Sequence, residues 1–229
     1  MEALAAMEVI EDYRLEAMMK NGGAGSQRAA SDVDWRQLAL YGVSHALNDL
    51  FSLPPEARTA ARVEALIERR WTNRGYKFAS REHYHHVKRC AVQALVRYAA
   101  SRQEQAGPLL LFETIQTHIS PLNVDLSLNL QLLWGGEKEA AGEFRIHRFV
   151  MEARPQENES FFHLATLLGY HAFGRLPQSI EVWSVLGGGG ARCQPSLEHL
   201  QASYDYLRLI RDYMKEADEE MAPLRRRCT

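Results

Sequence analysis

The sequence predicts a mixed α/β fold of the α+β type, in which extra N-terminal helices precede a β-sheet flanked by helices. Three observations support this. Apolar residues recur with a helical period before Gly107-Pro108, they alternate after it, and helix and strand patterns follow one another in the last third of the chain. The chain has 229 residues, of which 46% are hydrophobic, so one core can hold most of it. We therefore expect a single main domain.

The first hundred residues carry the helical period. Residues 1–20 have apolar positions at close to helical spacing, and the glycine-rich NGGAGS that follows ends this helix. Residues 1–26 are therefore expected to form an N-terminal helix and a flexible joint. Three further helices are expected, over 33–53, 56–70 and 82–105.

Three strands are expected in the middle of the chain, over 108–119, 124–134 and 144–151. The second is the clearest, because apolar residues alternate along it from Val124 to Leu132. The GGEKEAAGE segment after it predicts a hairpin to the third strand. On the third strand one face should carry Phe144, Ile146 and Arg148, and the other Arg145, His147 and Phe149.

The last third of the chain alternates between helix and strand patterns. A helix is expected over 159–173 and a strand over 179–186, and the glycines at 187–190 are expected to form a loop. Ser196 is a candidate N-cap for a final helix through Ile210. The resulting boundaries are 27–215 for the main domain and 216–229 for a C-terminal tail.

Composition argues against several classes of function. The formal net charge is -2, so no overall field draws the chain to nucleic acid or to an anionic membrane. Cys90, Cys193 and Cys228 stand far apart without a CxxC pair, which argues against a structural zinc and a disulfide framework. No apolar run approaches the ~18 residues of a membrane span, and the acidic start lacks the features of a signal peptide. We expect a cytoplasmic protein with no membrane partner.

Several strings of the sequence occur in an order that a known superfamily shares. YGVSHALNDLF places His45 on an early helix, and LLLFETI places Glu113 on the first strand. LSLNLQLLW supplies the hydrophobic frame of a second strand, RIHRFV takes the place of a signature strand I-x-D-x-K, and GYHAFGRLPQSIEVWSVLGGG matches a following helix and strand. Over residues 35–212 the chain thus resembles the PD-(D/E)XK nuclease superfamily, in particular its RecB-like exonuclease branch. The resemblance implies a restriction-endonuclease-like mixed sheet flanked by helices.

The same resemblance implies a site that has lost its chemistry. Nucleases of this fold hold one or two divalent ions with carboxylates and use a lysine near the attacking water. Here Gln131 stands in place of the first aspartate, Arg148 in place of the second and Val150 in place of the lysine. Only His45 and Glu113 remain, so the expected site binds no metal. We expect Arg148 to fill the former metal position and to pair with Glu113.

A local excess of positive charge is the best nucleic-acid signal in the chain. Residues 54–104 contain eleven basic and five acidic side chains, with aromatic residues such as Trp71 among them. Positive charge follows phosphates and exposed rings stack on bases, so this segment is a candidate nucleic-acid surface. The alternative is a solvated helical face with its aromatic residues in the core. The candidate contacts are Arg69, Arg70, Arg74, Lys77, Arg81, Lys88 and Arg89.

Three functions stay open. The first is a catalytically inactive nuclease-fold protein without a cofactor, serving as an interaction or regulatory module in DNA repair, recombination or defence. The second is an active Mg²⁺- or Mn²⁺-dependent DNA nuclease whose acidic ligands have migrated to Asp125, Glu143 or Glu152. The third is a non-catalytic nucleic-acid-binding module. The partner would be a protein in the first case, DNA in the second, and DNA or RNA in the third.

Overall fold

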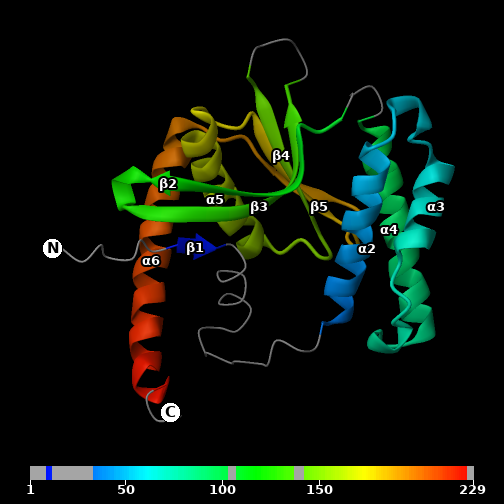
Figure 1. Cartoon of the computed structure of the whole chain (residues 1–229), viewed down its shortest axis with the longest axis horizontal. Coiled ribbons are helices and arrows are strands. Elements are labelled where there is room, and N and C mark those ends of the chain that lie inside the picture. The colour runs from blue at the N-terminus through cyan, green and yellow to red at the C-terminus, as the bar shows by residue number, and fades with distance from the viewer. Residues whose placement is uncertain (1–8, 12–32, 103–106, 137–141, 226–229) are drawn as a thin grey trace.

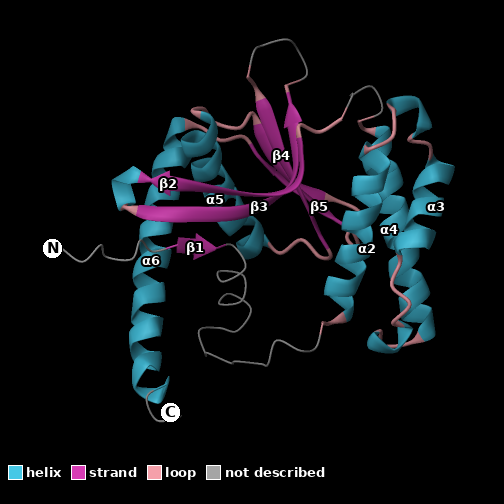
Figure 2. Cartoon of the chain, viewed as in Figure 1, coloured by secondary structure: helices cyan, strands magenta, loops and turns pink. Residues whose placement is uncertain are grey.

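The structure is a computed structural model that describes residues 9–11, 33–102, 107–136 and 142–225. Over these residues the chain is a mixed α/β molecule, in which helices flank a six-stranded sheet (Figures 1 and 2). The predicted fold class is confirmed. None of the described helices has the length and apolar character that crossing a membrane needs.

Three helices form one layer, on the right of Figure 1: α2 (Trp35–Phe51), α3 (Ala60–Arg70) and α4 (Arg81–Ala100). All three were predicted. A capping box starts α2: the Asp34 carboxylate accepts from the backbone N–H of Gln37 at 2.9 Å, and the Gln37 side chain accepts from the N–H of Asp34 at 3.2 Å. The box therefore fixes the residue at which α2 begins.

The sheet is built on an antiparallel meander of β2 (Leu110–Ile119), β3 (Val124–Gly135) and β4 (Phe144–Val150). Next to it, β5 (Ser179–Ser184) lies parallel to β4, and β6 (Gly190–Cys193) lies antiparallel to β5. The predicted strands and the hairpin between the second and third of them are confirmed. β6 begins inside the segment expected to be a loop. Its close approach to β5 requires glycine at its first position, because a Cβ there would lie 2.2 Å from a backbone oxygen of β5.

Two helices cover the other face of the sheet. α5 (Pro155–Phe173) connects β4 to β5, as a parallel pair of strands requires, and α6 (Leu197–Arg225) packs beside it. α5 begins four residues before the predicted helix, since Pro155 occupies the first turn, where the missing N–H costs nothing. α6 continues past residue 216, where the sequence predicted the start of a tail.

A short strand stands where the sequence predicted a helix. β1 (Val9–Glu11) pairs in parallel with the first part of β3, and Ile10 lies opposite Leu126. The prediction of a helix over residues 1–20 is therefore wrong for these three residues, and the rest of that segment lies outside the described residues. Ile10 is fully buried, so its burial against β3 outweighs the weak local preference of a short helix.

β2 and β3 bend together and give the molecule two cores (Figure 1). Up to Leu130 the apolar residues of β3 face α5 and α6, whereas Leu132 packs in the core beneath α2 and α4. The alternating apolar residues of β3 therefore do not all lie on one face, because the strand turns over between Leu130 and Leu132. The pairing of β2 with β3 skips Phe112 and Gln131, which lie at this bend. Phe112 has a φ of 53°, in the left-handed region.

The two faces of β4 are as predicted. Phe144 and Ile146 lie in the core with α5, and Phe149 lies in the core with α2 and α4. β4 is therefore the central strand from which side chains reach both helical layers.

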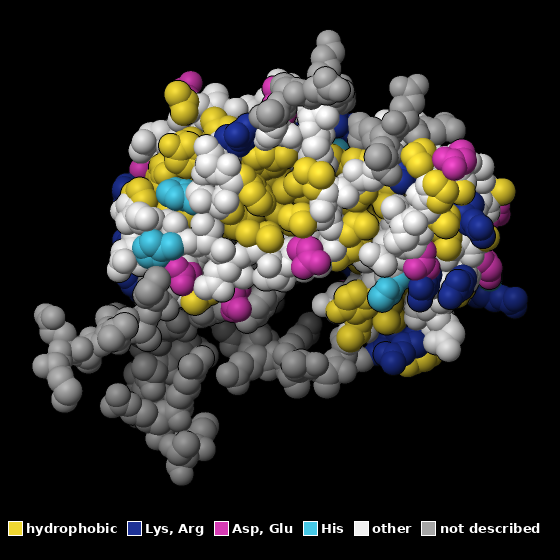
Figure 3. Space-filling model, turned by 45° about the horizontal axis from the view of Figure 1, so that its top comes forward, with side chains coloured by type: hydrophobic (Ala, Val, Ile, Leu, Met, Phe, Trp, Pro, Cys, Tyr) yellow, Lys and Arg dark blue, Asp and Glu magenta, His cyan; other side chains and the backbone are white. Residues whose placement is uncertain are grey.

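The outer surface is mixed. In Figure 3 hydrophobic side chains gather over the middle of the visible face, and at the right, where α2 to α4 lie, basic side chains are interspersed with acidic and apolar ones.

Candidate functional site

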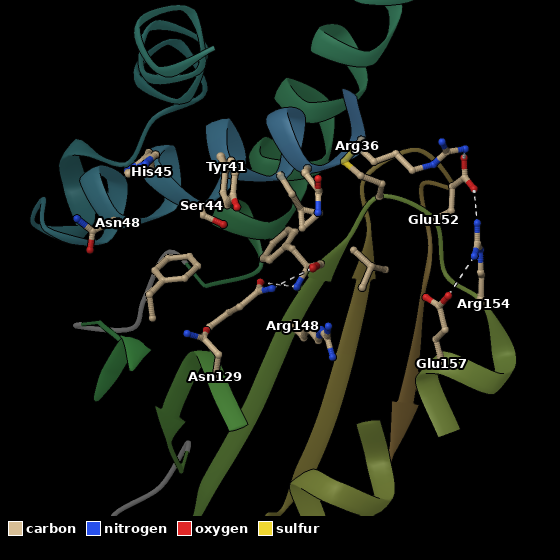
Figure 4. A pocket seen from close by; sticks show the side chains of 17 residues that line it. Arg36, Tyr41, Ser44, His45, Asn48, Asn129, Arg148, Glu152, Arg154 and Glu157 are labelled. Atoms are coloured by element: carbon tan, nitrogen blue, oxygen red, sulfur yellow. Dashed lines mark hydrogen bonds and ion pairs between the residues drawn. The ribbon is translucent and has the colours of Figure 1, made fainter. Parts of the chain in front are cut away.

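A groove opens where β3 and β4 separate, between β4 and α2 (Figure 4). The pairing of these two strands stops at Leu132 and His147. The next positions toward the groove are Gln131 on β3 and Arg148 on β4, the two positions predicted to have replaced metal ligands. The groove has a volume of about 690 Å³, within the usual range of ligand sites.

One wall of the groove is α2. Every exposed residue of this helix, Gln37, Tyr41, His45 and Asn48, lines the groove. The spacing of these polar residues at intervals of three and four is the signal by which the sequence could have shown this wall. The apolar part of the lining consists of Leu40, Phe112, Phe149, Val150 and Met151.

The side chain of Gln131 bridges the gap between the separating strands. Its Oε1 accepts from the backbone N–H of Phe149 at 2.8 Å, and its Nε2 donates to the carbonyl of Phe149 at 3.1 Å. The amide thus makes the two hydrogen bonds that the peptide group of a neighbouring strand would make. Gln131, predicted to stand in place of a metal ligand, therefore uses its side-chain amide to bind the backbone of β4.

The structure brings three of the four predicted site residues to the groove: His45, Gln131 and Arg148 all line it. The Arg148 guanidinium lies 4.8 Å from the ring centroid of Phe161, a cation–π contact on the face of the sheet that α5 covers. Glu113 is exposed on β2 and is not part of the lining. Its ion pair with Arg148 stays a prediction.

Four charged residues form a chain at one end of the groove (Figure 4). Arg36 lies 3.5 Å from Glu152, Arg154 lies 3.9 Å from Glu152, and Arg154 lies 3.0 Å from Glu157. These side chains are partly exposed, so each pair contributes only about 0–1 kcal/mol to stability. Because the charges alternate in sign, this end of the groove is close to neutral.

Of the three carboxylates expected as migrated ligands, only Glu152 lines the groove. Asp125 lies on the bent arm of β3, where His118 contacts it at 2.9 Å, and Glu143 accepts a hydrogen bond from Gln178 at 3.3 Å. Within the part of the chain that the structure describes, no three His, Cys, Asp or Glu residues are grouped so that they could hold a metal ion. The acids therefore do not converge on the groove.

The candidate nucleic-acid surface is partly used for internal ion pairs. Arg70 donates two hydrogen bonds to the Asp49 carboxylate, at 2.6 and 2.8 Å, and these hold the pKa of Asp49 below its ordinary value. Lys88 pairs with Glu68. The exposed members of the predicted set are Arg69, Arg74, Arg81 and Arg89.

Most aromatic residues of the same segment belong to the fold. Trp71 and Phe78 are buried, and the Tyr84 hydroxyl donates to a backbone carbonyl of the preceding turn at 2.8 Å. Tyr76 is 79% exposed, and the ammonium of Lys77 lies 5.8 Å from its ring centroid. For Trp71 and Phe78 the structure therefore supports the alternative of core aromatics.

A buried polar network lies behind the groove, and no sequence pattern predicted it. Trp134 Nε1 donates to the Tyr98 hydroxyl at 2.8 Å, and this hydroxyl lies 2.7 Å from His147 Nδ1. The Tyr98 hydroxyl thus links Trp134 to His147, and Nε2 on the other side of the His147 ring lies 3.6 Å from the Glu181 carboxylate. Burial, with the positive charge of Arg102 nearby, lowers the pKa of His147 to about 2. The ring is therefore neutral.

No family model matches the chain, and no curated protein matches it. The functional argument therefore proceeds from the groove and its residues.

Proposed function

We propose that this chain is a catalytically inactive nuclease-fold protein that acts as an interaction or regulatory module. The proposal depends on one observation: the side chains of Gln131 and Arg148 are engaged in contacts within the protein. The amide of Gln131 is bonded to the backbone of Phe149, and the Arg148 guanidinium packs over Phe161. Mg²⁺ requires oxygen ligands, most often carboxylates, and neither Gln131 nor Arg148 supplies a carboxylate.

The arrangement of the strands supports the kinship behind this proposal. A helix, an antiparallel meander, a second helix and a parallel strand follow one another, and they carry the strings that resemble the nuclease superfamily. Gln131 and Arg148 fall on neighbouring strands where these separate, a place from which two ligands could reach one ion. This arrangement supports the proposal of a former nuclease site that now carries different side chains. A role in DNA repair, recombination or defence follows from the same kinship and belongs to the proposal.

A nuclease assay tests the proposal. The purified chain is incubated with labelled single- and double-stranded DNA in Mg²⁺ or Mn²⁺, and we expect no cleavage above the level without protein. Metal-dependent cleavage that is lost in Glu152→Gln but kept in Glu143→Gln would overturn it. Glu143 is the matched control, because it is an acid that does not line the groove.

One observation favours the active nuclease as a second candidate. Glu152 and Glu157 are carboxylates that line the groove, so two potential ligands are near the predicted site. Both are paired with arginines, and a cation would have to displace Arg154 to reach them. The variants of the nuclease assay decide between the two candidates.

The exposed arginines keep the nucleic-acid-binding module as a further candidate. Arg69, Arg74, Arg81 and Arg89 are available to phosphates. Binding of labelled DNA whose affinity falls steeply with salt, and falls further on changing Arg74→Ala and Arg81→Ala together, would favour it. Binding that is insensitive to these changes would exclude this surface.

A further inference from the structure

We infer that the groove between α2 and β4 binds an extended peptide segment of a protein partner, with an apolar side chain inserted between the helix and the strand. This inference rests on the proposed function, and it states how an interaction module of this shape would hold its partner.

The length of the groove suits a short stretch of extended chain. Its α2 wall runs from Arg36 to Asn48, roughly 18 Å at the helical rise of about 1.5 Å per residue. An extended peptide advances about 3.3 Å per residue, so about five residues span this wall. The polar residues of α2 that would otherwise face open solvent all lie along this path.

The lining combines an apolar floor with hydrogen-bonding groups on the wall. Phe149 and Met151 are buried in the floor and Leu40 is half-buried beside them, so an apolar side chain that enters the groove leaves water and packs against apolar groups. Asn48 and Tyr41 are exposed on the wall and can bond to the backbone of a peptide. Within the chain itself, the amide of Gln131 already holds the backbone of β4 in this manner.

Charge favours a peptide over a polyanion. Of the three arginines that line the groove, Arg148 packs over Phe161, and Arg36 and Arg154 are paired with Glu152 and Glu157 in a chain of alternating sign. A nucleic-acid backbone would meet the glutamates as well as the arginines, and it would have to break these pairs to gain the positive charge. A peptide without net charge meets no such cost. The occupant that the lining fits is therefore a largely uncharged segment with at least one large apolar side chain.

A plugging variant tests the inference. Ser44 lies half-buried in the middle of the α2 wall, so Ser44→Trp fills the groove without removing a core residue. The matched control is Gln93→Trp, at an exposed position of α4 outside the groove. Random seven-residue peptides displayed on phage are panned on the full chain, and an enriched peptide is then made with a fluorescent label. We expect enriched peptides to carry an apolar residue and to bind the wild-type and Gln93→Trp chains equally, with at least a tenfold weaker Kd for Ser44→Trp.

Asn48→Trp is a second plugging variant, at an exposed position where a bulky ring does not disturb the core. The melting temperature of each variant shows whether it is folded, and the folded variants are compared. The inference is overturned by a lack of enrichment, or by peptides that bind the plugged chains as tightly as the wild type. A labelled thymidine oligonucleotide of about 20 nucleotides is tested in the same way. If it binds the wild-type chain and both plugging variants weaken that binding, the groove binds single-stranded nucleic acid and the inference is overturned. If panning fails and the chain does not cleave DNA, only the inference of peptide binding is rejected. Metal-dependent cleavage would instead reject the proposed function.

Discussion

The amide of Gln131 makes both of its hydrogen bonds to the backbone of one residue, Phe149. We predict that Gln131→Ala lowers the free energy of unfolding by about 1–3 kcal/mol, because it removes these partners from a buried N–H and C=O. Urea denaturation measures the change. The matched control is Gln116→Ala, an exposed amide on β2, which should cost less than about 0.5 kcal/mol. Equal costs for the two variants would mean that the Gln131 bridge adds nothing to stability.

At the same scale, the sequence could place some site residues and not others. The resemblance to the nuclease superfamily implied that His45, Gln131 and Arg148 share a site, and all three line the groove. Glu113 is not in the lining. It follows Phe112, whose positive φ marks the bend of β2, and a phenylalanine gives no indication of a left-handed backbone. The pairing of Gln131 with β4 depends on the separation of two strands, which no local pattern encodes.

The pairing of β1 with β3 gives a prediction for a whole element. Ile10 is fully buried in the core that α5 and α6 cover. We predict that Ile10→Ala lowers the free energy of unfolding by about 2 kcal/mol or more, in the range of buried Ile→Ala changes. Chemical denaturation measures this loss, and Glu11→Ala, half-buried at the end of the same strand, is the control that should cost less. An Ile10→Ala chain as stable as the wild type would mean that β1 does not contribute to the core.

Long elements were predicted well because their patterns repeat. β3 and α4 are long enough for a period of two or of about 3.6 to be counted, whereas β1 has three residues and β6 has four. Such short strands are stabilised by the edge they pair with: β1 by β3, and β6 by β5. β3 lies far from β1 in the sequence, and a glycine-rich turn separates β5 from β6. The local pattern around Ile10 therefore favoured a helix that the tertiary contact overrides.

The whole molecule is organised around β4, whose two faces contribute to two cores. The groove lies at the C-terminal end of this strand, and the buried network of Tyr98, Trp134 and His147 lies just behind it. A change that protonates His147 would place a charge among buried groups and weaken the contact between α4 and the sheet. Stability and the shape of the groove should therefore depend on pH together.

Acid should destabilise the fold through His147. Its pKa is lowered to about 2 by burial, whereas an unfolded histidine titrates near 6.5, so between these values unfolding takes up a proton and the free energy of unfolding falls as the pH falls. The loss reaches about 1.4 kcal/mol per pH unit for one such group, and His163, whose pKa burial also lowers, acts in the same direction. We predict that His147→Gln is less stable than the wild type near neutral pH but loses stability more slowly between about pH 6 and pH 4. Urea denaturation across this range measures both slopes, and His85→Gln, at an exposed position, is the control for the replacement of a histidine outside the core. Parallel curves for His147→Gln and the wild type would show that His147 is protonated in the folded chain.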